Sequence, residues 1–186
     1  MAGVIPRTDP RPLAGEPMSI DLLNTVWNDA AGPRDLLDDV AGLTAWLTAV
    51  GLTATSSSSE ATRLALRQAR DAIRTNADQP GSPAAREALN RVLTHGSLVR
   101  TLTLDGPTTS VHVDDPAQHA AWVAAENFLH LLHRPDRIRR CAHPHCVLYF
   151  YDTSPKGNRR WCSMSGCGNR AKAARHYSRR RTAPRT

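Results

Sequence analysis

The chain has 186 residues, of which 40% are hydrophobic and only 5% aromatic, and it carries a formal net charge of +7. This length allows one medium-sized domain and one small domain, and no apolar run approaches the roughly 18 residues that a membrane helix needs. The charge is uneven, since residues 137–186 carry 13 Lys or Arg and one acid, whereas residues 1–136 carry 11 basic and 16 acidic residues. This asymmetry predicts two modules with different partners, of which the basic one is typical of a nucleic-acid binder.

The chain begins with a proline-rich stretch, residues 1–17, which we expect to be a mostly extended leader. It contains no apolar segment followed by a small-residue cleavage site, so we expect a cytoplasmic protein without membrane attachment. From Met18 onward, Ile20, Leu23 and Trp27 recur at helical spacing, and Ser19 is a suitable N-cap. The pattern predicts a first helix that ends at Gly32-Pro33.

Three further helices follow in the pattern. They cover Leu36–Val50, Glu60–Ala77 and Ala84–His95, with a Ser/Thr-rich connection at 53–59 and a turn at 78–83. In the helix from Glu60 we expect Leu64, Leu66, Ala69 and Ile73 to face inward. Its four arginines, Arg63, Arg67, Arg70 and Arg74, should mostly face solvent.

The periodicity then changes from helix to strand. Residues 98–104 and 110–114 predict a two-stranded hairpin with a longer loop around Asp105-Gly106-Pro107. Pro116 is well placed to begin a long helix, which Arg134-Pro135-Asp136 ends. The predicted fold is therefore mostly α with a small β-hairpin: a helical domain at 18–135, followed at 136–186 by a small metal-binding finger made of a short β-hairpin and a helix.

All four cysteines of the chain fall in the finger. They form two Cys-x4-Cys pairs, Cys141 with Cys146 and Cys162 with Cys167, separated by fifteen residues. Four thiolates on two short turns can enclose one Zn²⁺ tetrahedrally, so we expect zinc as cofactor. Two disulfides would require an oxidising compartment, and four buried free thiols would not require paired spacing. His143 and His145 are expected to be loop residues rather than ligands.

The residues between the two pairs predict the local fold. The run 147–151 suits a strand and the segment 152–158 is rich in turn formers, which places Cys146 on an outgoing strand and Cys162 on the returning one. A basic helix should begin near Asn169. No catalytic motif is present, and zinc held by four thiolates cannot hold a catalytic water, so we do not expect an enzyme.

The basic segment resembles the CGNR zinc finger, named for the tetrapeptide that stands here as Cys167-Gly168-Asn169-Arg170. The match extends over about forty residues and includes RRC-x4-C, DTS and RRWCSM. Ile20–Thr25 partly resembles the opening signature of the ABATE family, although Leu23 replaces its usual aromatic residue. The resemblance implies a bacterial transcription regulator in which a helical regulatory domain precedes a zinc-dependent DNA-binding module.

Under this resemblance, side chains of the finger should contact double-stranded DNA. Asn169 and Arg170 suit base edges, although they could instead cap the metal knuckle. The residues expected at phosphates are Arg159, Arg160, Lys172, Arg175, Arg179 and Arg180.

Two alternatives remain. An RNA-binding or ribosome-associated protein could stack bases on Tyr149, Phe150, Tyr151 and Trp161, if they are exposed. A protein-interaction module would carry the basic tail incidentally.

The helical domain, by the same resemblance, should bind a small-molecule effector or form a homodimer. We expect the effector pocket near Asn24, Trp27 and Trp46. The alternative is that Asn24 bonds nearby backbone and that Trp46 belongs to the core.

Overall fold

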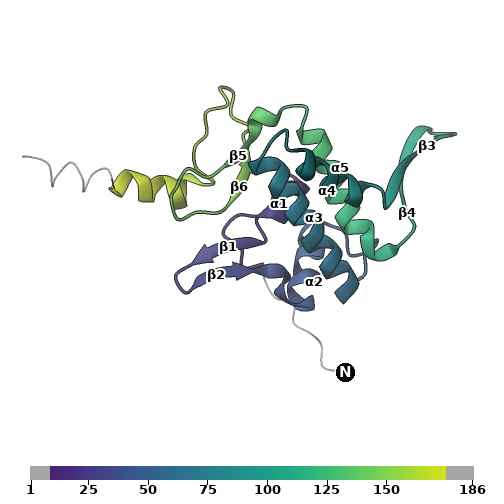
Figure 1. Cartoon of the computed structure of the whole chain (residues 1–186), viewed down its shortest axis with the longest axis horizontal. Coiled ribbons are helices and arrows are strands. Elements are labelled where there is room, and N and C mark those ends of the chain that lie inside the picture. The colour runs from purple at the N-terminus through teal and green to yellow at the C-terminus, as the bar shows by residue number, and fades with distance from the viewer. Residues whose placement is uncertain (1–8, 175–186) are drawn as a thin grey trace, which may run out of the picture.

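The computed structural model describes residues 9–174 and is mostly α-helical with small antiparallel strand pairs, as predicted (Figure 1). The helices are α1 (Met18–Leu23), α2 (Val40–Ala49), α3 (Glu60–Asp78), α4 (Pro83–Leu93) and α5 (His119–Leu131). The strand pairs are β1 (Val26–Asp29) with β2 (Gly32–Asp35), β3 (Gly96–Thr103) with β4 (Gly106–Val113), and β5 (Ile138–Arg140) with β6 (Tyr149–Tyr151). Short 3-10 turns lie at Leu36–Asp38, Pro116–Gln118 and Pro135–Arg137.

Helix α3 lies at the centre of the helical part, where α1, α4 and α5 contact it (Figure 1). It begins at an N-cap, Ser59, whose hydroxyl accepts a hydrogen bond from the backbone N–H of Thr62. Leu66, Ala69 and Ile73 are buried as predicted, but Leu64 is 48% exposed. The inward face of α3 is therefore narrower than the sequence pattern indicated.

The prediction for the first helix was wrong beyond Leu23. Val26–Asp29 pairs as a strand with Gly32–Asp35, and Asp29 accepts a hydrogen bond at 2.7 Å from the N–H of Ala31 in the intervening turn. Gly32 closes this turn at a φ of +122°, which other residues rarely adopt. Apolar spacing over two turns of chain did not distinguish a short helix followed by a strand from one longer helix.

The starts of α1 and α2 also differ from the prediction. Ser19 is not a cap: α1 follows Pro17, and the Ser19 hydroxyl donates to Asn127 Oδ1 at 2.9 Å. Helix α2 starts at Val40 rather than at Leu36, because the Asp39 carboxylate accepts from the N–H of Gly42 at 2.7 Å and so caps a new helix.

Arg70 does not belong to a solvent-facing stripe. Its side chain is 4% exposed and forms two hydrogen bonds of 2.6 Å with the Asp35 carboxylate, while Nη1 donates to the Thr25 hydroxyl at 2.7 Å. The buried ion pair joins α3 to the end of β2. Because a desolvated charge needs a partner, Arg70 could be buried only with Asp35 opposite it.

The predicted hairpin after α4 is present, but its loop is shorter than expected. Thr103 pairs with Gly106, so only Leu104 and Asp105 connect the strands. Gly106 has a φ of +113°, which suits a tight connection. In Figure 1 this hairpin projects from the helical part.

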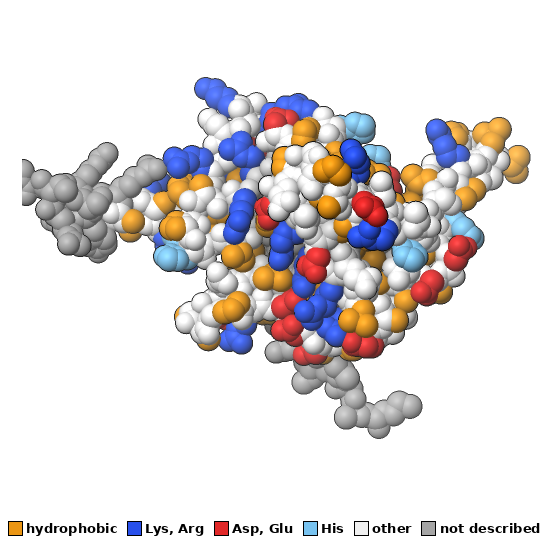
Figure 2. Space-filling view, in the orientation of Figure 1, with side chains coloured by type: hydrophobic (Ala, Val, Ile, Leu, Met, Phe, Trp, Pro, Cys, Tyr) orange, Lys and Arg blue, Asp and Glu red, His pale blue; other side chains and the backbone are white. Residues whose placement is uncertain are grey.

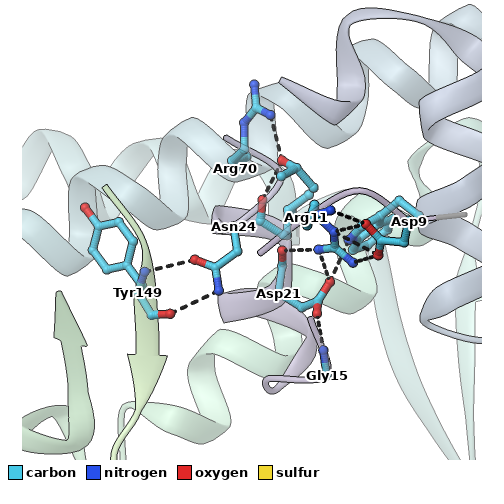
Figure 3. Close-up of polar contacts among 10 residues, drawn as sticks. Asp9, Arg11, Gly15, Asp21, Asn24, Arg70 and Tyr149 are labelled. Carbon is cyan, nitrogen blue, oxygen red and sulfur yellow. Dashed lines mark hydrogen bonds and ion pairs between the residues drawn. The ribbon is translucent and has the colours of Figure 1, made fainter. Parts of the chain in front are cut away.

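Residues 9–17 are held against the helical part by a buried arginine. The Arg11 side chain is fully buried and pairs with Asp9 at 2.6 Å and with Asp21 of α1 at 2.5 Å (Figure 3). Asp21 also accepts from the Gly15 N–H at 2.8 Å and from Trp46 Nε1 at 3.0 Å. This part of the expected leader is therefore bonded to α1 through Asp21, which also bonds α2.

The finger residues continue the same hydrophobic core as the helices. Leu148, Tyr149 and Phe150 are buried together with residues of α1, α3 and α5. Within residues 9–174, no helix has both the length and the apolar character required to cross a bilayer.

Candidate metal centre and nucleic-acid interface

Two short turns bring the four cysteine side chains together. Cys141 follows β5, and its N–H donates to Leu148 O at 2.9 Å, while the N–H of Cys146 donates to His143 O at 2.9 Å. Cys162 lies in the segment after the 152–158 loop, and Cys167 lies in a π-helical turn, η4 (Met164–Gly168). The Ser163 hydroxyl starts that turn by accepting from the N–H of Gly166 at 3.0 Å.

The sulfur positions fit a tetrahedral zinc site. All four Sγ atoms lie within 4.8 Å of one another. The Cys146–Cys162 and Cys162–Cys167 Sγ distances are 3.8 and 3.6 Å. Zn–S bonds of about 2.3 Å in a tetrahedron place sulfurs about 3.8 Å apart. A disulfide requires about 2.05 Å, and all four cysteines are free thiols.

The close sulfurs perturb one another's ionisation. Hydrogen bonding from Cys162 lowers the pKa of the Cys146 thiol to about 5. The same hydrogen bond, with burial, raises the pKa of Cys162, and burial raises the pKa of Cys141. The thiolate form is thus favoured at Cys146 and disfavoured at Cys141 and Cys162. Four thiolates together need a compensating cation, which a divalent metal would supply.

A backbone N–H and a guanidinium N–H donate hydrogen bonds to the cysteine sulfurs. The backbone N–H of Cys162 donates to Cys141 Sγ at 3.4 Å, and Arg170 Nη2 donates to Cys167 Sγ at 3.1 Å. Donors of this kind offset negative charge on thiolate ligands and fix their orientation. In this structure Arg170 therefore contacts the cysteine cluster.

The strand arrangement expected around the cysteines was partly wrong. The strand at Tyr149–Tyr151 is present, but its partner is Ile138–Arg140 and not a strand that carries Cys162. Cys146 lies before β6 and not on it. The segment 152–158 forms its own loop around Asp152, whose carboxylate accepts from the N–H groups of Ser154 and Arg159, both at 2.9 Å. After this loop the chain returns beside the end of β5, where Arg160 O accepts a hydrogen bond from the N–H of Ala142 at 2.9 Å.

Arg159 has several protein partners. Its guanidinium lies 4.3 Å from the centroid of the Phe150 ring, donates to Trp161 O and Cys162 O, and pairs with Glu16 at 3.5 Å. These contacts describe a side chain that links the leader to the metal centre. Sequence reasoning assigned Arg159 to phosphate and did not single out Glu16, since nothing in a linear sequence marks their pairing.

The other residues expected to contact DNA make fewer contacts within the described part of the protein. Arg160 is exposed, with its guanidinium 5.2 Å from the Trp161 ring centroid, and Lys172 is exposed on the helix at 169–174. Asn169 donates to Ser165 O at 3.4 Å. Arg175, Arg179 and Arg180 lie outside the described residues. Figure 2 shows Lys and Arg side chains over the finger, whereas most acidic side chains visible in this view lie over the helical part.

The aromatic residues of the finger are not available as a common stacking surface. Phe150 is fully buried and Tyr149 is 3% exposed, with its hydroxyl donating to Asp78 at 2.6 Å. Burial and the negative charge of Asp78 raise the pKa of Tyr149. Tyr151 and Trp161 are half-buried against the same core.

The three residues expected at an effector pocket lie in different surroundings. Asn24 and Trp46 are fully buried and bond Tyr149 and Asp21 respectively. Trp27 lines a cleft of about 800 Å³ between the β1–β2 hairpin and the finger, with His145 and Arg170 on its other side. Asn28 spans its edge by donating to His145 O at 3.2 Å.

The four-cysteine cluster beside a mostly helical part is typical of a zinc-finger protein. Two family models match the chain: the putative stress-induced transcription regulator domain, ABATE, over residues 16–135, and the CGNR zinc finger over residues 137–180. The chain belongs to the ABATE family and carries a CGNR zinc finger. A search of curated proteins produced no match to this chain.

Proposed function

We propose that this protein regulates transcription by binding double-stranded DNA through its zinc-stabilised finger. The observation that carries the proposal is the cluster of four cysteine sulfurs directly beside the most basic part of the chain. Cys141, Cys146, Cys162 and Cys167 hold Zn²⁺, which supplies folding free energy that so small a module needs. A zinc ion with four thiolates is coordinatively closed, so the metal has a structural role and the protein is not an enzyme.

The exposed cations of the finger bind phosphate. Arg160 and Lys172 contribute in the described part, and Arg175, Arg179 and Arg180 extend the basic segment. Arginine suits this role because its planar guanidinium bonds phosphate oxygens in pairs. Asn169, at the start of the helix, is the candidate for a base edge, while Arg170 and Arg159 support the finger. Burial of Tyr149 and Phe150 favours duplex DNA over single-stranded RNA, since neither ring can stack on a base.

Free thiols that bind zinc require a reducing compartment, so we place the protein in the cytoplasm. We also assign the effector site to the cleft lined by Trp27, because a ligand there would touch both the helical domain and the finger. Screening a metabolite panel by thermal shift tests this assignment. A ligand that raises the melting temperature of the wild type and equally that of Trp27→Leu binds elsewhere.

The DNA proposal is tested by zinc removal and restoration. The full chain is titrated against a mixed-sequence duplex at low salt as the zinc-loaded form, after chelation, and after zinc is returned. We expect binding to be lost and then recovered, and Cys162→Ser to behave like the chelated protein. Equal affinity in the loaded and chelated states contradicts the proposal. Preferential binding of a single-stranded RNA of equal length assigns the finger to RNA instead.

A further inference from the structure

The β3–β4 hairpin is an arm that no other part of residues 9–174 covers. Gly96, Gly106 and Val113 are half-buried, and every other residue of the two strands is exposed. The arm is firmly attached at its base: a Cβ on Gly96 would lie 2.8 Å from His112 O and 2.9 Å from the Trp122 ring. An isolated two-stranded hairpin is marginally stable in water, so an arm of this length is expected to bind something.

The two faces of the arm differ in chemistry. Leu98 lies opposite Val111 and Leu102 opposite Pro107, which places two apolar pairs on one face, with Arg100 opposite Thr109 between them. The other face carries Thr101 opposite Thr108. On the apolar face and at its tip, Leu98, Leu102 and Leu104 are 47%, 81% and 107% exposed. Single exposed leucines are ordinary, but an apolar face concentrated on a projecting arm marks an interaction surface (Figure 2).

A surface that complements the tip is present on the same chain. A pocket of about 510 Å³ between α3 and α4 is lined by the apolar side chains of Ala65, Ala72, Ala88 and Val92 and by the polar side chains of Gln68, Asp71, Thr75, Arg91, His95 and Gln118. It lies at the base of the arm, since His95 directly precedes β3. In a contact between two copies, Leu104 of the tip would face the apolar lining and Asp105 would face Arg91, whose exposed side chain pairs with Glu87 at 3.2 Å within α4. Eight-residue strands extend about 26 Å, so an arm cannot reach the pocket at its own base.

We propose that the β3–β4 arm is the dimerisation element of this protein and that its partner is a second copy of the chain. The two arms run antiparallel with their apolar faces together, and each tip enters the pocket at the base of the other arm. A two-fold axis satisfies both surfaces at once, because the contact that buries one tip also buries the other. This inference is independent of DNA binding and of zinc.

Sedimentation velocity of the zinc-loaded full chain between micromolar and 100 micromolar concentrations tests the arm. We expect a dimer for the wild type and, for Leu102→Ser combined with Leu104→Ser, a dissociation constant raised by about 10⁴-fold, roughly tenfold for each of the four leucines that the two protomers lose together. The matched control is Val99→Thr, since Val99 is 45% exposed but lies on the opposite face. It should dimerise like the wild type, and circular dichroism should show all three chains equally folded.

A charge exchange tests the position of the tip. Asp105→Arg and Arg91→Glu should each weaken self-association, because like charges then meet at both ends of the dimer. An equimolar mixture of the two variants should associate more tightly than either alone, since opposite charges meet at both ends of the mixed dimer. A monomeric wild type, an equal effect of Val99→Thr and the double leucine variant, or a mixture no tighter than its components overturns the proposal. If the monomeric wild type binds anionic lipid vesicles through Leu102 and Leu104, the arm serves a membrane surface instead.

Discussion

The side-chain amide of Asn24 pairs with the backbone of Tyr149 in the way that a neighbouring strand would. Asn24 Oδ1 accepts from the Tyr149 N–H at 2.9 Å, and Nδ2 donates to Tyr149 O at 3.0 Å (Figure 3). The two residues are 125 positions apart, and both are buried. The residue at the end of α1 therefore pairs with the free backbone N–H and C=O of Tyr149 at the edge of β6. Strand β6 follows the first cysteine turn.

Replacing Asn24 by alanine should destabilise the protein and loosen the finger. The change leaves two buried backbone groups of Tyr149 without partners, and each costs about 1–3 kcal/mol. We expect the free energy of unfolding in urea to fall by about 2–6 kcal/mol, and zinc to pass faster to a coloured chelator. Asn28→Ala is the control, because its bond to His145 O is exposed and should be worth little. Equal losses of stability and equal rates of zinc transfer in the two variants would contradict a stabilising contact between Asn24 and the finger.

The Asp35–Arg70 pair should make stability depend on acid. Burial raises the pKa of the Asp35 carboxyl, but the hydrogen bonds and charge of Arg70 outweigh it, so the pKa lies below its usual value. A carboxyl with a lowered folded pKa stabilises the protein fully above its unfolded value of about 3.9, and this contribution is lost as pH falls through the folded pKa.

Asp35→Asn keeps the side chain's ability to cap the Leu37 N–H but removes the charge. At pH 7 we expect a loss of about 3–5 kcal/mol, since Arg70 is then buried without a counter-charge. The difference from wild type should shrink in urea titrations below pH 4 or so. Asp38→Asn, whose exposed pair with Arg67 spans 3.4 Å, should change stability little at any pH. A pH-independent difference for Asp35→Asn contradicts the assignment.

Arg159 and Arg160 are adjacent but should behave differently. Arg160→Ala should weaken duplex binding and lower the slope of log affinity against log salt by about 1, while leaving thermal stability unchanged. Arg159→Ala should instead lower the melting temperature, because it removes the contacts with Phe150, Glu16 and the two carbonyls. Binding by fluorescence anisotropy at four salt concentrations, with parallel melting curves, separates the effects. A reversal of the two phenotypes would show that the wrong arginine faces DNA.

Arg11→Met should show that residues 9–17 are part of the folded structure. The side chain is fully buried, so its removal leaves Asp21 with an uncompensated charge and should cost about 3–5 kcal/mol. Arg34→Met removes an exposed pair with Asp29 of similar length, 2.7 Å, and should change stability little. Chemical denaturation of both variants measures the contrast. Equal small losses would mean that the leader contributes nothing to stability.

The sequence alone determined the class of fold and the position of the candidate metal site. Helices α3, α4 and α5 were predicted within a few residues because each combines a long apolar period with a local capping or breaking residue, such as Ser82, Pro83 or Pro116. The cysteine cluster was predicted because ligand identity and spacing are written in one short segment. Local signals of this kind need no knowledge of the rest of the chain.

Only the tertiary structure decided which polar residues are structural. The Asn24–Tyr149 contact and the Asp35–Arg70 and Glu16–Arg159 ion pairs each join residues at least 35 positions apart. Whether a polar side chain is buried depends on a partner that only the folded chain brings near. For the same reason the strand at Val26–Asp29 and the partner of β6 could not be predicted, because strand pairing is a contact between segments and a single segment shows no sign of it.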